Sequence, residues 1–192
     1  YGKILSSDVI ALFPYGGLNL HGSILPKFRG AAPINRAILA GETRLGVSVI
    51  HITPKVDAGP VIAIDSYEPD ESETAPTIEN YLAEMGGNLL IKAIEKIERQ
   101  EDQAIPQNGN EATTAPKIRK EEGKIDWTAS VRQIRNQYRA LQPWPKTFTD
   151  WRRTSAPSGS EAPPLRLILG PLEIAEKFDH ETVSAKDLPS CG

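Results

Sequence analysis

Two polar residues at the end of a short apolar run carry groups that can take part in chemistry. Asn19 and His21 stand two positions apart at the end of residues 17–21. In an extended strand such residues share one face, roughly 6–7 Å apart. An amide and an imidazole at that spacing suit stabilisation of a developing oxyanion and transfer of a proton. We therefore expect a site at this strand end, the place where α/β sheets bind ligands.

A carboxylate stands after a second strand-like run. Asp57 lies in the loop 53–59, in the order Val-Asp-Ala-Gly, where an aspartate is often only a turn former. Because Asp57 follows a strand end, as Asn19 and His21 do, we predict that the three side chains meet in one cleft. A carboxylate beside an imidazole favours the charged ring and can relay a proton.

The segment after His21 is punctuated by turn formers. We predict that the backbone of Ser23–Pro26 lines a pocket and that Arg29 holds a polyanionic tail. A structural salt bridge is the alternative for Arg29. The other two histidines, His51 and His180, receive no role. Scattered histidines, a single cysteine and the lack of a Gly-rich phosphate loop predict neither a metal site nor a nucleotide loop.

Hydrophobic spacing predicts the elements that position these residues. Residues 46–52 and 60–67 are rich in β-branched side chains and are predicted to be strands. Apolar residues at helical spacing predict a long helix over 78–97, with Thr77 as its N-cap. Shorter helices are expected at 33–40 and 129–141, and short strands at 165–169 and 172–175.

The later part of the chain is basic, although the whole chain has a net charge of −3. Residues 99–116 are polar and contain Pro, Gly and Asn, which favours a linker. Residues 117–153 then hold 10 Lys and Arg against 4 Asp and Glu. On the helix within them, Arg132, Arg135 and Arg139 form a stripe. One interpretation is a face that binds a polyanion, and the other is a solvated, salt-bridged surface.

Composition is that of a globular protein. Of the 192 residues, 39% are hydrophobic and 24% are charged. No run of about 18 apolar residues predicts a membrane span, and the single cysteine, Cys191, fits a reducing compartment. Since no secretory leader is recognisable, we expect a cytoplasmic protein. Because the chain opens on Tyr1 directly in a motif, we also expect an N-terminal part to be missing.

Four stretches of the first half resemble a known family. Asn-Leu-His-Gly-Ser-Ile-Leu-Pro at 19–26 and Arg-Gly-Ala-Ala-Pro-Ile at 29–34 are similar to the signature of the folate-dependent formyltransferases. The Asp57-x-Gly59 loop resembles that family's third catalytic position. Tyr1–Leu5 is similar to the segment whose backbone contacts the folate pterin.

Within the family, two motifs most resemble the members that formylate methionyl-tRNA. One is Arg-Gly-Ala-Ala-Pro-Ile, and the other runs through residues 117–127 and 139–145. The resemblance implies an α/β fold in which residues 1–98 are the C-terminal half of a Rossmann-like formyltransferase domain. Residues 99–116 would be a linker, and 117–192 a small, incomplete β-barrel (OB-like) domain that binds tRNA.

The implied activity is transfer of a formyl group from 10-formyltetrahydrofolate to the amino group of initiator methionyl-tRNA, in support of translation initiation. The implied enzyme needs no metal, and we expect a monomer. Asn19, His21 and Asp57 would be catalytic. Folate would contact Ser23, Ile24, Leu25 and Pro26 together with Tyr1, Gly2, Lys3, Ile4 and Leu5, and tRNA would contact Arg29, Arg132, Arg135 and Arg139.

Other readings of the chain remain open. The acceptor could be a sugar-nucleotide amine, or the chain could resemble the hydrolase domain of formyltetrahydrofolate dehydrogenase, because these relatives share the same three polar residues. The basic residues 117–153 favour tRNA. A non-catalytic RNA-binding module is a further alternative, and the presence of Asn19, His21 and Asp57 together speaks against it.

Overall fold

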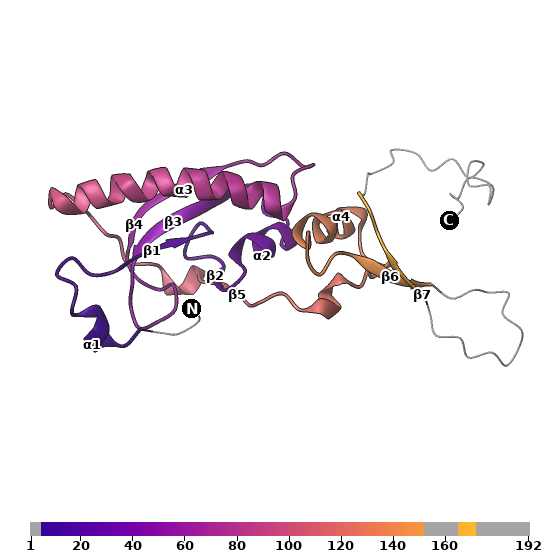
Figure 1. Cartoon of the computed structure of the whole chain (residues 1–192), viewed down its shortest axis with the longest axis horizontal. Coiled ribbons are helices and arrows are strands. Elements are labelled where there is room, and N and C mark those ends of the chain that lie inside the picture. The colour runs from indigo at the N-terminus through magenta and orange to yellow at the C-terminus, as the bar shows by residue number, and fades with distance from the viewer. Residues whose placement is uncertain (1–4, 152–164, 172–192) are drawn as a thin grey trace, which may run out of the picture.

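The computed structural model describes residues 5–151 and 165–171. Figure 1 shows helix α3 lying along a small sheet in the first half of the chain, with α4 and the β6–β7 pair at the other end. In chain order the elements are α1 (Ser7–Ile10), β1 (Leu18–His21), β2 (Arg29–Gly30), α2 (Pro33–Leu39), β3 (Leu45–His51), β4 (Val61–Tyr67), α3 (Ala75–Glu98), η1 (Gly109–Glu111), β5 (Thr114–Ala115), η2 (Lys120–Gly123), α4 (Val131–Ala140), β6 (Phe148–Trp151) and β7 (Leu165–Ile168).

The sheet that carries β1 has three strands in the order β1-β3-β4. Both pairings are antiparallel, with Asn19 opposite Ile50 and His21 opposite Ser48. Because side chains alternate along a strand, Asn19 and His21 lie on one face and Leu20 on the other. Two smaller pairings complete the described strands: β2 is parallel to β5, and β6 is antiparallel to β7. The elements confirm the expected mixed α/β class.

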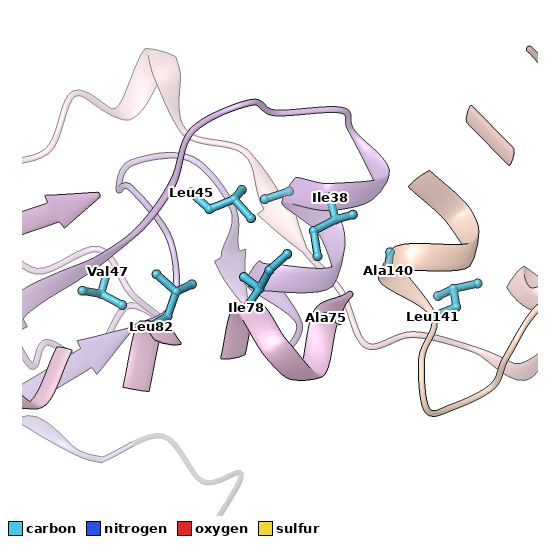
Figure 2. Close-up of a cluster of buried hydrophobic side chains, with 9 residues drawn as sticks. Ile38, Leu45, Val47, Ala75, Ile78, Leu82, Ala140 and Leu141 are labelled. Carbon is cyan, nitrogen blue, oxygen red and sulfur yellow. The ribbon is translucent and has the colours of Figure 1, made fainter. Parts of the chain in front are cut away.

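The main hydrophobic core lies between the sheet and the helices α2, α3 and α4. Ile78 and Leu82 of α3 are at most 2% exposed and pack toward Ile38 and Val47. Figure 2 shows that α4 contributes to the same cluster, whose buried members are Ala37, Ile38, Leu45, Val47, Ala75, Ile78, Leu82, Ala140 and Leu141. The helix after the predicted linker therefore shares its core with the part before it.

Most predicted elements form within a few residues of their expected bounds, and one helix start differs. The long helix begins at Ala75 with Thr74 as its N-cap, so the prediction of Thr77 as N-cap was wrong. Pro76 is tolerated in the first turn, where its missing N–H would have no helical partner. Thr77 instead accepts a hydrogen bond from the Thr74 backbone N–H over 3.0 Å. The predicted strand at 172–175 lies outside the described residues.

The segment predicted as a linker is bonded along its length to the first half. Ile105 and Val61 exchange two backbone hydrogen bonds of 2.8 Å each. Further on, the Thr113 carbonyl accepts from Arg29 N over 2.9 Å, just before the β2–β5 pairing. The domain boundaries stay a prediction, but residues 99–116 are not a free spacer. Among the residues with described structure, no helix has the length and apolarity needed to cross a membrane.

Candidate active site

The three predicted catalytic side chains converge in the structure. Asn19 Nδ2 donates to Asp57 Oδ1 over 3.1 Å, and His21 Nδ1 lies 3.5 Å from Asp57 Oδ2. The backbone N–H of Gly30 donates to the same Oδ2 over 2.8 Å. The side chains of His21 and Asp57 are only 6% and 13% exposed. A carboxylate with few water contacts is thus held by donors from two separate segments, and we call this group the Asp57 cluster.

The path of the chain that brings Asp57 to this cluster differs from the one expected from the sequence. Because β1 and β3 are antiparallel, the end of β3 at His51 lies beside Leu18, not beside His21. The loop after β3 must therefore fold back over the face of β1 that carries Asn19. Asp57 adopts φ +47°, a left-handed conformation that non-glycine residues rarely take. The convergence was expected, but matching strand ends do not explain it.

The two ring nitrogens of His21 face different partners. Nε2 lies 2.9 Å from the carbonyl oxygen of Phe28, which can only accept, so this nitrogen carries a hydrogen. The other ring nitrogen, Nδ1, lies 3.5 Å from Asp57 Oδ2. The ring is therefore held between a backbone carbonyl and the Asp57 carboxylate.

A cavity of about 210 Å³ adjoins the Asp57 cluster. Asn19 and Asp57 contribute its polar groups, and apolar side chains form most of the rest. One hydrogen of Asn19 Nδ2 is donated to Asp57, and no described residue accepts the second. The cavity thus combines a hydrogen-bond donor and a carboxylate with a wall of low polarity. It is lined by Leu5, Asn19, Ile50, Ile52, Thr53, Pro54, Val56 and Asp57.

The described residues of the predicted folate segments line two different cavities. Ser23 and Ile24 line a second cavity of about 210 Å³, while Leu25 is 4% exposed and part of the core. The turn is fastened to β3 by Ser48, which donates to the Ser23 carbonyl over 2.7 Å and accepts from Leu25 N over 3.1 Å. Pro26 is half-buried. Leu5 lines the first cavity, and Tyr1–Ile4 lie outside the described residues.

Arg29 binds a residue that the sequence argument missed. Its Nε and Nη2 both donate to the side-chain oxygen of Gln107, over 3.0 and 2.6 Å. The amide nitrogen of Gln107 donates in turn to the carbonyls of Asp57 and Gly59. Ser48 was also missed, although a serine inside the apolar run of β3 is a signal that could have found it. Gln107 gave no such signal, since it stands in a segment of linker composition.

The arginine stripe of α4 faces other parts of the chain. Arg135 is paired with Glu71. Arg139 donates through Nε to the Glu73 carbonyl over 2.7 Å and through Nη2 to the Asp70 carbonyl over 3.1 Å. Arg132, whose side chain is 78% exposed, lies 3.8 Å from Glu71. Of the three arginines in the stripe, Arg135 and Arg139 are therefore bound most closely within the chain, and Arg132 has the most exposed side chain.

Arg36 of α2 also makes an ion pair and hydrogen bonds to the later part of the chain. It forms an ion pair with Glu122 and donates to the carbonyls of Pro116 and Lys117. Hydrogen bonds from Arg36 hold the pKa of the Glu122 carboxyl below its usual value of 4.5. Burial lowers the pKa of the Arg139 guanidinium from its ordinary value. We call the contacts made by Arg36, Arg135 and Arg139 the junction.

Comparison with known proteins identifies two matched regions. Residues 1–94 match the family described as Formyl transferase, and residues 117–160 match the family described as Formyl transferase, C-terminal domain. The chain is 44% identical over 152 residues to the methionyl-tRNA formyltransferase of Sulfurihydrogenibium sp., covering 79% of this chain and 49% of that protein. It is 43% identical over 154 residues to the methionyl-tRNA formyltransferase of Fusobacterium nucleatum, covering 80% and 50%.

A solved structure supports the same relationship. The sugar 3N-formyl transferase WlaRD, crystallised in the presence of dTDP and 5-N-formyl-THF, superposes with a TM-score of 0.61 at 26% identity. The match covers 64% of this chain and 45% of that one. The chain spans about half the length of the curated relatives it matches. Since both family regions occur in the expected order and the relatives cover most of the chain, the chain belongs to the formyl transferase family.

Proposed function

We propose that the whole protein transfers a formyl group from 10-formyltetrahydrofolate to the amino group of methionyl-tRNA. The observation that supports this most is the Asp57 carboxylate, held by Asn19 and Gly30 beside His21 and next to an apolar cavity. The names of the two relatives support the acceptor. The formylated folate present in the WlaRD crystals supports the class of donor.

The cluster has the groups that formyl transfer requires. A neutral amine attacks the formyl carbon, a new C–N bond forms, and negative charge develops on the formyl oxygen. We propose that Asn19 donates its second amide hydrogen to this oxygen and that the His21 imidazolium stabilises the charge. One such donor is worth about 100- to 1,000-fold in rate. Asp57 would take the proton that the amine loses and deliver it to the folate nitrogen as the original C–N bond breaks.

The cavity beside Asn19 fits part of the donor. Pockets for drug-sized ligands have volumes of about 300–1,000 Å³, and this cavity has about 210 Å³. It would therefore hold the formyl-bearing portion, with its ring system against the apolar wall. We propose that Ser23, Ile24, Leu25, Pro26 and the segment Tyr1, Gly2, Lys3, Ile4 and Leu5 form further folate contacts.

We propose that the basic later part of the chain contacts the tRNA backbone. Arg132 is the member of the stripe with the most exposed side chain, and it would contact phosphate directly. Arg29, Arg135 and Arg139 hold protein groups in this structure. Their contribution to tRNA binding would come through the surfaces they position. We also propose that the protein acts in the cytoplasm as a monomer.

A sugar-nucleotide amine is the second candidate acceptor, supported by the similarity to WlaRD. A formylation assay of the whole protein separates the two proposals. Methionyl-tRNA, free methionine and a dTDP-linked amino sugar are each supplied with 10-formyltetrahydrofolate. We expect formylation of methionyl-tRNA alone. Formylation of the amino sugar instead would overturn the acceptor, and failure with all three acceptors despite folate binding would overturn the proposed activity.

A further inference from the structure

The Asp57 loop is held by a side chain from a distant segment. Gln107 Nε2 donates to the carbonyl of Asp57 over 2.8 Å and to the carbonyl of Gly59 over 2.7 Å. Its Oε1 accepts from Arg29 Nε and Nη2. A primary amide has two donor hydrogens and two acceptor lone pairs. All four are therefore used here, and half of them fix the backbone of the loop.

The loop needs such support because its conformation is unfavourable by itself. Asp57 has φ +47°, and a non-glycine residue held there costs on the order of 1 kcal/mol or more. Gly59 packs so closely on β3 that an added Cβ would overlap the His51 carbonyl oxygen. The loop is thus pressed onto the strand at Gly59 and tied by Gln107 at both carbonyls. Neither constraint touches the carboxylate itself.

Gln107 also connects this loop to the segment that binds the carboxylate. Arg29 holds the oxygen of Gln107, and the next residue, Gly30, donates its N–H to Asp57 Oδ2 over 2.8 Å. Residues 29 and 30 therefore fix Asp57 in two ways. Gly30 binds the side chain of Asp57 directly, and Arg29 holds the backbone of Asp57 through Gln107. A shift of the loop would move the carboxylate relative to both Gly30 and Asn19.

The segment that carries Gln107 is anchored on both sides. Ile105 exchanges two backbone hydrogen bonds with Val61. On the other side, Thr113 Oγ1 accepts from Phe28 N over 2.8 Å, and β5 pairs with β2. Gln107 therefore extends from a backbone that is itself fixed, so its amide can hold the loop in place.

We propose that Gln107 is a positioning residue for catalysis: it sets the place of the Asp57 carboxylate by binding the backbone on both sides of Ala58. This rests on the proposed function, in which Asp57 handles the proton. A residue of the segment between the two matched family regions would then belong to the active site. Since misplacement of a reacting group by about 1 Å costs about 100-fold in rate, we expect loss of Gln107 to lower kcat by about 10- to 100-fold.

The test uses Gln107→Met and Gln107→Glu in the whole protein, with Gln103→Met and Gln103→Glu as matched controls. Gln103 is exposed in the same segment, and its variants should keep the wild-type rate. Gln107→Glu retains an acceptor for Arg29 and loses the donor to the two carbonyls. We expect both Gln107 variants to lower kcat with KM for folate unchanged. Equal kcat in wild type and Gln107→Glu would overturn the proposal.

A double-mutant cycle separates positioning from a general structural role. If Gln107 acts through Asp57, Gln107→Glu should cause no further loss of kcat in an Asp57→Asn background. An additive loss would overturn the proposal. If Asp57→Asn alone keeps the wild-type rate, the proposed catalytic role of Asp57 fails, and the positioning proposal falls with it.

Hydrogen exchange provides a readout without substrate. We expect faster exchange at the Ala58 amide, which donates to the Lys55 carbonyl within the loop, in Gln107→Glu than in Gln103→Glu. Unchanged exchange at Ala58 would overturn the proposal even if the rate had fallen. Should Gln107→Met fail to fold, Gln107→Glu and this measurement still decide the question.

Discussion

The Asp57 cluster and the junction both join charged side chains to backbone groups, but they differ in what surrounds them. The cavity beside Asp57 has largely apolar walls. The 160 Å³ hollow beside the junction is lined by charges of both signs, including Glu71 and Arg139. A polar group beside an apolar wall interacts strongly with the polar groups of a bound ligand, because the local dielectric constant is low. Charges that already neutralise one another offer a ligand much less, so we expect chemistry at the Asp57 cluster and a structural role for the junction.

The sharpest test of this difference is Asp57→Asn, which removes the charge and keeps the shape. We expect turnover to fall about 100- to 10,000-fold, the usual contribution of a positioned acid or base. This corresponds to about 2.7–5.5 kcal/mol of activation free energy. Steady-state formylation measures it, and Asp65→Asn, on an exposed carboxylate of β4, is the control. Near-normal turnover in Asp57→Asn would place the chemistry elsewhere.

Arg36→Met should have its main effect on stability. The variant keeps an apolar stem like that of arginine and removes the donors to Glu122 and to the carbonyls of Pro116 and Lys117. Hydrogen bonds that involve a charged group contribute about 1.5–3 kcal/mol, so we expect a loss of about 2–3 kcal/mol in the free energy of unfolding.

Urea unfolding measures this loss, with Arg44→Met at an exposed arginine as the control. Below the melting temperature, Arg36→Met should keep wild-type turnover per folded molecule. A fall in turnover without a fall in stability would show that the junction takes part in the chemistry, and the contrast between the two regions would be lost.

Within the arginine stripe, Arg139→Met and Arg132→Met should differ. Arg139 binds two backbone carbonyls, so its loss should cost about 1 kcal/mol of stability. Arg132 is exposed, and its replacement should change stability by less than about 0.5 kcal/mol. In titrations of tRNA at several salt concentrations, Arg132→Met should lower the salt slope by about 1. If Arg139→Met lowers that slope equally, the stripe acts as one RNA-binding face.

The smallest expected effect is a change in acid sensitivity. The pKa of Glu122 is lowered in the folded state, chiefly by the hydrogen bonds from Arg36. The stabilisation that this provides is therefore complete above the ordinary pKa of 4.5 and is lost as the pH falls through the lower folded value. Glu122→Gln should unfold with a flatter pH dependence below 4.5 than the wild type. Parallel curves for the two proteins would mean that Glu122 is not the group that titrates.

The parts of the site that depend on local spacing are predictable from the sequence. The two-residue separation of Asn19 and His21 suffices to put them on one face, because strand alternation is a local property. The same is true of the arginine stripe, where spacing predicts which residues share a face but not what that face meets. Glu71 and the carbonyls of Asp70 and Glu73 lie more than 60 positions away in the chain.

Contacts between distant segments explain what could not be predicted. Asp57 lies against β1 because β1 and β3 pair in an antiparallel manner, and no sequence motif predicts this pairing. Gln107 stands 50 positions after Asp57, in a stretch whose composition indicates a linker. Composition reports the preference of a segment in isolation. It does not report the hydrogen bonds that a neighbouring loop offers once the rest of the chain has folded.

The β2–β5 pairing has a consequence for how the protein is made. The bond from Phe28 N to Thr113 Oγ1, next to this pairing, joins residues 85 positions apart. Contacts of such long sequence separation are slow to form, because a large loop must close first. A ribosome adds about 5–20 residues per second, so about 3–12 s pass between the synthesis of Asp57 and that of Ala115. During this interval the nascent chain already contains Asn19, His21 and Asp57. The strand β5, which anchors the segment that carries Gln107, has not yet been translated.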